Sequence, residues 1–467
     1  MKFFHRLQPW LCTAVVVVGL LEFLCEKNNI FTVCGGAVVL GALIFLFPRI
    51  STYARVVALV LCGSSLLAFF LFKTPPLPGE LIGGFTEMAS LVAVMAAVNI
   101  LGIPLEMGKY AGLFQRFFVR AKRPAQPYII SLLITYVLTF LSLAGAVGPS
   151  YYLVRENLKK LGLEKNSRLE TTSVARGYAM ALIVSPVAAT VGITVKYSGL
   201  SWKQLVGPVF LLSLAGLVAA FLMETNRKAG TGGQLSGQAA KQPQIQSANA
   251  QASSRRLAGF LILFTVVIGI ILFLEDVLHF SSLNSIALGC LAATFIWGAV
   301  SGRLAPLGRR SFSFFSRDIV KMADQTTLFA AAGFFTYAME ASGAIKLVGG
   351  LLELVVDRVG IVFILAAVPL FIVLLAFTGL HPFVSAIIIA KTLLASPFQF
   401  SPLGLALALM GGMAMSFMLS PFSISVLILS SLTGNSPYKL GFCWNSAFAA
   451  VFWGLTALFI FVATKLA

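Results

Sequence analysis

The sequence predicts an all-α polytopic membrane protein, and three observations carry this prediction. Hydrophobic residues make up 58% of the chain and charged residues only 11%, with a mean hydropathy of +0.94. A chain of this composition exposes too much apolar surface for water and must lie in a bilayer. Its apolar residues form runs whose length is near the roughly 20 residues that a helix needs to cross the hydrocarbon core. Finally, a segment in which a Ser-Pro pair interrupts an apolar run occurs twice.

The apolar runs divide the chain into four parts. Residues 1–81 hold three N-terminal spans, 82–225 form a first repeat, and 257–467 form a second repeat. Between the repeats, 226–256 is rich in Gly, Gln, Ser and Ala and is expected to be a flexible cytoplasmic linker. We expect about 11 spans and two hairpins, with runs near 8–25, 30–48, 56–72, 82–102, 127–147, 171–198, 203–223, 257–275, 284–301, 322–339, 360–398, 402–434 and 441–464.

The net charge of +18 reflects membrane topology and not a nucleic-acid partner. The Lys and Arg residues gather in short loops between apolar runs, as the positive-inside bias predicts. Placing these loops in the cytoplasm puts the N-terminus there as well. The expected location is therefore the cytoplasmic membrane, with the lipid bilayer as a partner.

The repeated phrase reads "IVSPVAATVGITVKYSGLSWKQL" at 183–205 and "MLSPFSISVLILSSLTGNSPYKL" at 418–440. An offset of 235 residues (420 − 185) places Ser185-Pro186 on Ser420-Pro421, and a Gly follows each Pro at the same spacing. Shared Ser-Pro, Gly and polar tail together predict an internal repeat. Proline removes a helical donor, so each pair either breaks its helix near mid-bilayer or only kinks it.

Topology predicts that the two repeats face opposite ways. Basic residues both precede run 127–147 and follow "VGPS" at 147–150, so a re-entrant hairpin turning at Gly148-Pro149 keeps them on one side. The matching turn in the second half is "GLHP" at 379–382, whose flanks carry few charges and suit the outside. Discontinuous helices at matching positions of inverted repeats are typical of secondary transporter binding sites.

The order of an amphipathic stretch (103–121 and 339–357), a hairpin, a broken helix and a closing helix, given twice, resembles the ion transporter superfamily. That group includes divalent anion:sodium symporters, citrate carriers and arsenite efflux permeases. In the dicarboxylate symporters the hairpin tips read Ser-Asn-Thr and the breaks carry a Thr-Pro-Pro-Asn-like element. Here the breaks read "SPVAAT" and "SPFSIS". The resemblance covers about 82–461, implies a mechanism and not a substrate, and by analogy implies a homodimer.

The resemblance also implies the candidate substrate- and ion-binding residues, by position. They are Pro149, Ser150, His381 and Pro382 at the hairpin tips, and Ser185, Pro186, Thr190, Ser420, Pro421, Ser423 and Ser425 at the breaks.

Three ionisable side chains lie within the apolar runs. Two of them, His381 and Arg176, have two interpretations each, and Glu87 has one. His381 has an intrinsic pKa suited to proton coupling, or is a hydrogen-bonded structural residue. Arg176 attracts an anion, or snorkels to the cytoplasmic surface. Glu87 lies near an outer helix end and is expected to be solvated.

The predicted function is secondary active transport of a small, anionic solute by alternating access, with no catalytic residue, bound metal or cofactor. A sodium or proton gradient supplies the coupling ion, as symport or antiport, since no nucleotide-binding P-loop appears. Two alternatives stay open. One is a membrane-embedded enzyme acting on lipid or polyprenyl-linked substrates, which generally needs clustered catalytic groups. The other is a channel or lipid-handling permease.

Overall fold

A computed structural model describes residues 2–21, 29–73, 77–108, 126–142, 146–160, 167–230, 250–346, 350 and 358–466. All regular elements among these residues are helices, which confirms the predicted all-α polytopic membrane class. Six helical stretches in the described ranges are long and apolar enough to cross a membrane: Thr52–Leu71, Pro78–Pro104, Trp202–Thr225, Ser282–Val300, Pro402–Thr433 and Lys439–Lys465. Shorter apolar helices are Leu7–Leu21, Ile30–Leu46, Gln126–Phe140, Ile361–Phe377 and Pro382–Leu394.

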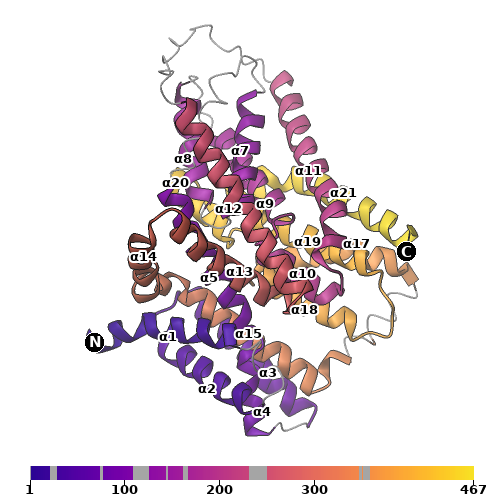
Figure 1. Ribbon diagram of the computed structural model, residues 1–467. Helices are drawn as coiled ribbons and strands as arrows, with labels where there is room; N and C mark the ends of the chain where they lie inside the picture. The colour runs from indigo at the N-terminus through magenta and orange to yellow at the C-terminus, as the bar shows by residue number, and fades with distance from the viewer. Residues whose placement is uncertain are drawn as a thin grey trace. The chain divides into compact units, whose positions relative to one another are not determined.

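The helices pack into two compact units, each assembled from separate parts of the chain (Figure 1). The first unit comprises residues 1–103, 267–364 and 379–400. Its elements are α1 (Lys2–Leu21), α2 (Asn29–Leu46), α3 (Thr52–Leu71), α4 (Pro78–Gly83), η2 (Gly84–Thr86), most of α5 (Ala89–Met107), the end of α12 (Ala250–Asp276), α13 (Ser282–Val300), α14 (Leu304–Ser316), η6 (Asp318–Met322), α15 (Ala323–Ala341) and α18 (Pro382–Leu394).

The second unit comprises residues 104–266, 365–378 and 401–467. Its elements are α7 (Gln126–Ser142), α8 (Val147–Lys160), α9 (Ser167–Leu182), α10 (Ala189–Ser198), α11 (Trp202–Gly230), the start of α12, most of α17 (Ile361–Phe377), α19 (Pro402–Leu419), α20 (Ile424–Thr433), the π-helical segment η7 (Lys439–Cys443) and α21 (Trp444–Leu466).

Two predicted spans, 171–198 and 402–434, are each divided into two helices. The first becomes α9 and α10, and the second becomes α19 and α20. Gly199 and Gly434 end the shorter helices in the same left-handed conformation, both with φ of +71° and ψ of 5°. This conformation favours glycine because a Cβ would be strained there. The two phrases of the sequence therefore fold alike.

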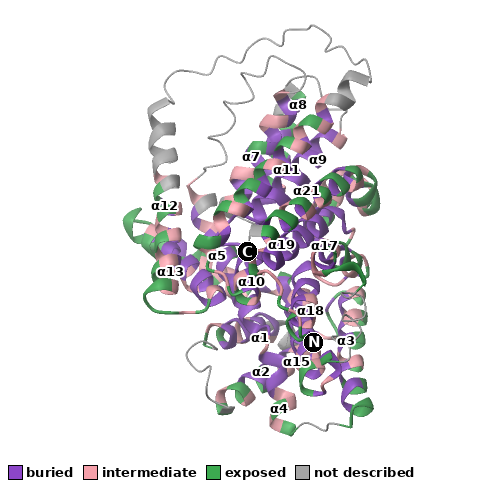
Figure 2. Ribbon diagram, turned by 90° about the vertical axis from the view of Figure 1, so that its right-hand side faces the viewer, coloured by how far each residue is buried: buried purple, intermediate pink, exposed green. Residues whose placement is uncertain are grey.

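Helices α9 and α19 form the buried centre of the second unit (Figure 2). Every residue from Leu169 to Leu182 and from Gly404 to Leu419 is buried. Each shorter helix packs against the long helix of the other repeat: α10 contacts α19, and α20 contacts α9. The first break is buried throughout, from Ile183 to Ala188, whereas in the second break Phe422 is 44% exposed.

Several details differ from the sequence predictions. Helices α8 and α14 carry basic residues that the sequence predicts in short loops between apolar runs. Helix α11 extends to Gly230 and α12 begins at Ala250, so the ends of the predicted linker are helical; residues 231–249 lie outside the described part. The predicted amphipathic stretches also lie partly outside it, from Lys109 in the first and over 347–349 and 351–357 in the second.

Candidate functional site

The two breaks have matching backbone hydrogen bonds. At the first, Ser185 N–H donates to Ala181 O at 3.0 Å, and Ala188 N–H donates to Ser185 O at 2.9 Å. At the second, Ser420 N–H donates to the carbonyl four residues earlier at 3.0 Å, and Ser423 N–H donates to Ser420 O at 3.1 Å. These bonds are related residue by residue through the offset of 235, since 188 + 235 = 423 and 185 + 235 = 420.

Pro186 leaves the carbonyl of Leu182 without its helical donor, because that N–H would come from residue 186. The hydroxyl of Thr190 donates to this carbonyl instead. Thr190 is fully buried and lies in the first turn of α10. A side-chain hydroxyl therefore replaces the backbone donor that the proline removes. Because Thr190 belongs to α10 and Leu182 to α9, this bond joins the two helices across the break.

The second break repeats this bond and adds another. Pro421 leaves the carbonyl of Phe417 without its helical donor, and the hydroxyl of Ser425 donates to that carbonyl at 2.5 Å. The hydroxyl of Ser423 donates to the same oxygen at 2.8 Å. The first break has Ala188 at the position of Ser423, so only the second break places two hydroxyls on one carbonyl.

The serines of both Ser-Pro pairs tie the breaks to a neighbouring helix. The hydroxyl of Ser185 donates to Phe140 O in α7 at 2.7 Å. The hydroxyl of Ser420 donates to Ala376 O in α17, also at 2.7 Å. Both acceptors lie at the C-terminal end of their helix, where carbonyls lack helical donors. The two breaks are therefore anchored by equivalent contacts.

Among the residues that the structure describes in the second unit, three further hydroxyls are fully buried and have no hydrogen-bond partner. They belong to Thr139, Ser150 and Ser416. Thr139 precedes the residue whose carbonyl holds Ser185, and Ser416 precedes Phe417. Buried polar groups are rarely left unsatisfied in native proteins, so these hydroxyls mark positions where a bound species could supply the missing partner.

The gap between α7 and α8 lies slightly before the turn that the sequence predicts at Gly148-Pro149. Helix α7 ends at Ser142 and α8 begins at Val147, so Gly148 and Pro149 lie in the first turn of α8 and not between the helices. The first turn tolerates proline because its N–H has no helical acceptor. Pro149 is exposed while Ser150 is buried, and α8 contacts α7, α9 and α20.

The predicted second turn matches a gap between helices. Helix α17 ends at Phe377 and α18 begins at Pro382, with Gly379 at a φ of +97°. His381 is the N-cap of α18, and its Nδ1 accepts the N–H of Phe383 at 3.3 Å. Pro382 is the buried first residue of the helix. His381 and Pro382 belong to the first unit, whereas the other candidate residues belong to the second.

Arg176 is buried in α9, so the interpretation in which it snorkels to the surface is wrong. Its Nη1 donates to the hydroxyl of Tyr128 at 2.9 Å and its Nε to Oδ1 of Asn445 at 3.0 Å. Its Nη2 donates to Trp444 O at 3.2 Å, and the guanidinium lies 4.9 Å from the ring centre of Phe448. These neutral partners tie α9 to the start of α21.

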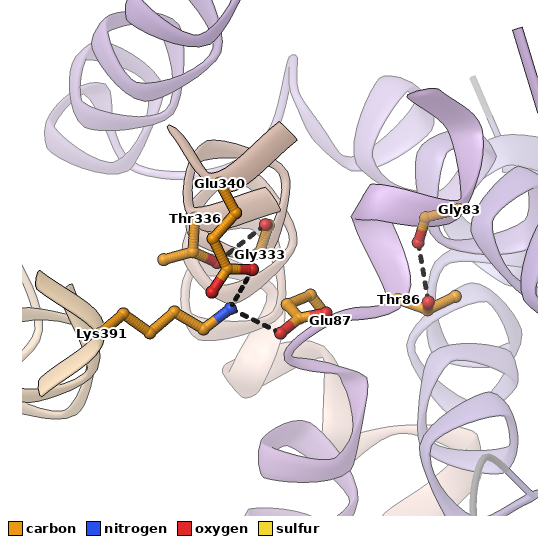
Figure 3. A network of polar contacts seen from close by, with 7 residues as sticks. All are labelled: Gly83, Thr86, Glu87, Gly333, Thr336, Glu340 and Lys391. Atoms are coloured by element: carbon orange, nitrogen blue, oxygen red, sulfur yellow. Dashed lines mark hydrogen bonds and ion pairs between the residues drawn. The ribbon is translucent and has the colours of Figure 1, made fainter. Parts of the chain in front are cut away.

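An ion-pair cluster in the first unit was not predicted (Figure 3). Lys391 Nζ lies 2.7 Å from Glu87 Oε1 and 3.1 Å from Glu340 Oε2, and the lysine side chain is only 9% exposed. Glu87 is therefore paired with a lysine, and the expectation that it is simply solvated is wrong. Its partner was hidden because Lys391 lies 304 residues away in the chain (391 − 87).

Close backbone packing brings the two glutamates together. A Cβ added at Gly333 in α15 would lie 3.2 Å from Met88 N and 3.3 Å from Glu87 Cβ. Beside this contact, Phe85 stacks on Phe334 with ring centres 4.5 Å apart. Glu340 lies two helical turns beyond Gly333 on the same face. Lys391 lies within the predicted apolar run 360–398 and was a signal for such a cluster, because a charge there needs a partner.

The second unit thus contains two repeat-related helix breaks, and helix α8 contacts both α9 and α20 beside them. No protein-family model and no curated protein matches the sequence. Solved structures do match the fold. The YdaH transporter of Alcanivorax borkumensis has a TM-score of 0.58 at 16% identity, over 87% of this chain and 97% of that one. MtrF of Neisseria gonorrhoeae, described within a class of antimetabolite efflux pumps, has a TM-score of 0.57 at 11% identity, over 90% of this chain and 96% of that one. The chain has the fold of these membrane proteins.

Proposed function

We propose that the protein is a secondary active transporter that moves a small, anionic solute across the cytoplasmic membrane by alternating access. One observation carries the proposal: two helix breaks with repeat-related hydrogen bonds lie in one compact unit, whose described residues include three buried hydroxyls without partners. Discontinuous helices of this kind form the binding sites of secondary transporters. The fold shared with solved transporters supports the same proposal.

The coupling ion in this proposal is sodium, held at the second break. Ser423 and Ser425 both direct their hydrogens to Phe417 O, and their oxygens lie 3.3 Å apart. With the hydrogens used, these oxygens offer lone pairs. Hard cations prefer oxygen ligands, and unwound segments coordinate Na⁺ in other transporters. The first break has an alanine in place of Ser423, so it offers fewer such ligands.

Protons are the second candidate for coupling, and His381 is the residue to test. Its Nδ1 accepts a backbone N–H at the start of α18, which is a capping contact. His381→Asn keeps an N-cap acceptor while removing the imidazole. If His381 only caps the helix, uptake by this variant keeps the parent's pH dependence. A flattened pH dependence at normal expression assigns proton coupling to His381 and counts against sodium.

The orientation of the repeats is a further part of the proposal. Single cysteines at Gln126 and Lys159, which flank the first hairpin, are expected to react with a membrane-impermeant maleimide from the cytoplasmic side. Cysteines at Val359 and Gln399, which flank the second, are expected to react from outside. Opposite-side labelling within either pair would remove the hairpin and the inverted repeat.

A thermal-shift screen tests the function itself. The purified protein is heated with small anions, each with sodium or with choline as the cation. A ligand that binds only the folded state stabilises it, by about 2.7 kcal/mol at a concentration 100 times its Kd. We expect at least one anion to raise the melting temperature more in sodium than in choline. A screen with no stabilising anion in either cation would contradict an anion transporter.

A further inference from the structure

A buried carboxyl group lies in the first turn of α9. It belongs to Glu170, which is 2% exposed and whose Oε1 has no hydrogen-bond partner. Acidic side chains are almost never fully buried unless they are paired, because an ionised group loses much free energy when it leaves water. An ionisable residue buried in the helical core of a membrane protein is by default a candidate functional group.

Polar contacts of the Glu170 side chain come from α8. The hydroxyl of Tyr151 is hydrogen-bonded with the Glu170 carboxyl group, and Tyr151 is itself buried. Nη1 of Arg155 donates to the same hydroxyl at 3.3 Å, and the guanidinium lies 5.9 Å from the centre of the Tyr151 ring. Arg155 is exposed. The three side chains therefore form a line of polar groups from the protein surface to a buried carboxyl group.

Among the described residues, the charge that acts on Glu170 is the guanidinium of Arg155. On α7, which also packs against α9, Tyr128 is bonded to Arg176 and Tyr136 to Ser213. Helices α19 and α20 contain no ionisable residue. The remaining ionisable residues of α9 and of the elements that contact it are Arg168, Tyr178, Tyr152, Glu156, Lys159, Lys160, Lys203, Glu224, Arg227, Lys228, Lys439, Cys443 and Lys465. Arg155 is thus the charge to vary in a test.

We propose that Glu170 is a proton-binding site, which Tyr151 and Arg155 connect to the aqueous surface. Its carboxylate takes a proton from water and becomes a neutral acid, and it returns the proton to water on release. Burial favours the neutral acid, whereas the Arg155 cation and the N-terminal end of α9 favour the carboxylate. Because α8 contacts both α9 and α20, the charge at Glu170 changes beside helices of both breaks. The proposal holds whichever ion drives transport.

Infrared spectroscopy measures the protonation of Glu170 directly. Full-length protein in detergent is compared with Glu170→Gln at about pH 6, where exposed glutamates, which titrate near pH 4.3, are ionised. We expect the carbonyl stretching band of a protonated carboxyl group in the parent and its loss in Glu170→Gln. The band should also disappear from the parent at alkaline pH. Glutamine keeps the shape of the side chain and an acceptor for Tyr151, so this variant is expected to fold.

A carbodiimide gives a second measurement that needs no variant. Dicyclohexylcarbodiimide is apolar and reacts with protonated carboxyl groups, and the modified peptide is identified by mass spectrometry. The internal control is Asp318, whose side chain is 46% exposed and paired with Lys321. At about pH 6 we expect Glu170 to be modified more than about tenfold faster than Asp318, because an exposed aspartate is almost fully ionised there.

Variants of Arg155 test the connection to the surface charge. Arg155→Gln removes the cation that favours the carboxylate, so the protonated fraction of Glu170 at about pH 7 should rise. Arg155→Lys keeps the positive charge and should change this fraction less. Lys73→Gln changes the net charge by the same amount at an exposed residue of the first unit, and it should leave the fraction unchanged.

Three results would overturn the proposal. The first is identical infrared spectra of the parent and Glu170→Gln at every pH, which would make Glu170 only an ionised partner of Tyr151. The second is equal modification of Glu170 and Asp318. The third is a protonated fraction that rises as much in Lys73→Gln as in Arg155→Gln. None of these measurements uses a transported solute, so their outcome is separate from that of the anion screen.

Discussion

Ser425 donates its hydroxyl hydrogen to the carbonyl of Phe417, eight residues earlier, at 2.5 Å. That carbonyl is the one that Pro421 deprives of a helical donor. Thr190 makes the same contact with Leu182 in the other repeat. Each break therefore includes its own compensation, and helix breaks in a membrane require such compensation because no water reaches the backbone.

The two compensating hydroxyls are expected to differ in importance. Thr190→Ala should lower the free energy of unfolding by about 1–2 kcal/mol, because it leaves the Leu182 carbonyl buried without a donor. Ser425→Ala should cost less than about 1 kcal/mol, because Ser423 still donates to Phe417 O. Unfolding in detergent measures both. Thr190→Ser keeps the hydroxyl and is the matched control; equal losses for the two alanine variants would show that the second hydroxyl gives no protection.

The serines of the Ser-Pro pairs are expected to act equivalently on ligand binding. Ser185→Ala and Ser420→Ala each remove a 2.7 Å bond to a neighbouring helix. Hydrogen bonds in membrane proteins average about 0.6 kcal/mol and reach about 1.7, so each variant should weaken binding by at most about 20-fold. The measurement is the affinity for the solute identified by the thermal screen. A change from one repeat only would argue against a site shared by both.

Arg176 is expected to hold α9 to α21 and not to bind the solute. Arg176→Met removes the donors to Tyr128, Asn445 and Trp444 and should destabilise the folded protein by about 2–4 kcal/mol. Arg176→Lys keeps the charge with fewer directed donors, so its stability should lie between that of the parent and that of Arg176→Met. Unfolding curves and solute affinity are measured together. Normal stability with lost anion binding would instead make Arg176 a binding residue.

Lys391 is expected to matter for stability more than an ordinary surface lysine. Lys391→Met leaves Glu87 and Glu340 close together without a cation and should cost about 1–3 kcal/mol, reduced from a fully buried pair because both glutamates are partly exposed. Adding Glu87→Gln and Glu340→Gln should recover most of the loss. Lys321→Met is the control, since its pair with Asp318 is exposed and worth little. Equal losses for Lys391→Met and Lys321→Met would contradict the structural role.

The breaks and their capping glycines were predictable because local chemistry determines them. Ser-Pro within an apolar run cannot continue a helix, and Gly199 and Gly434 are needed where the backbone becomes left-handed. The choice of acceptor was not predictable. Sequence does not say that Ser185 would reach Phe140 in α7, because that contact depends on how α7 packs against α9.

Long-range charge pairing was also beyond the sequence. Glu87 and Lys391 come from elements whose proximity is decided by tertiary packing, including the close approach at Gly333. The snorkelling interpretation of Arg176 was wrong for a related reason. The partners of Arg176 at the start of α21 are the neutral groups of Asn445 and Trp444. These partners are missed when only nearby carboxylates are sought in the sequence.

The most direct test of the two-break site is the affinity of folded, monodisperse protein for its stabilising solute, with sodium present, in the parent, Pro186→Ala and Pro421→Ala. Alanine restores the N–H that can donate to Leu182 or Phe417, so it competes with Thr190 or Ser425 and rewinds the break. We expect either substitution to weaken binding by more than about 20-fold, beyond the loss of a single hydroxyl bond. If both alanine variants bind the solute like the parent, the breaks are only kinks and the site lies elsewhere.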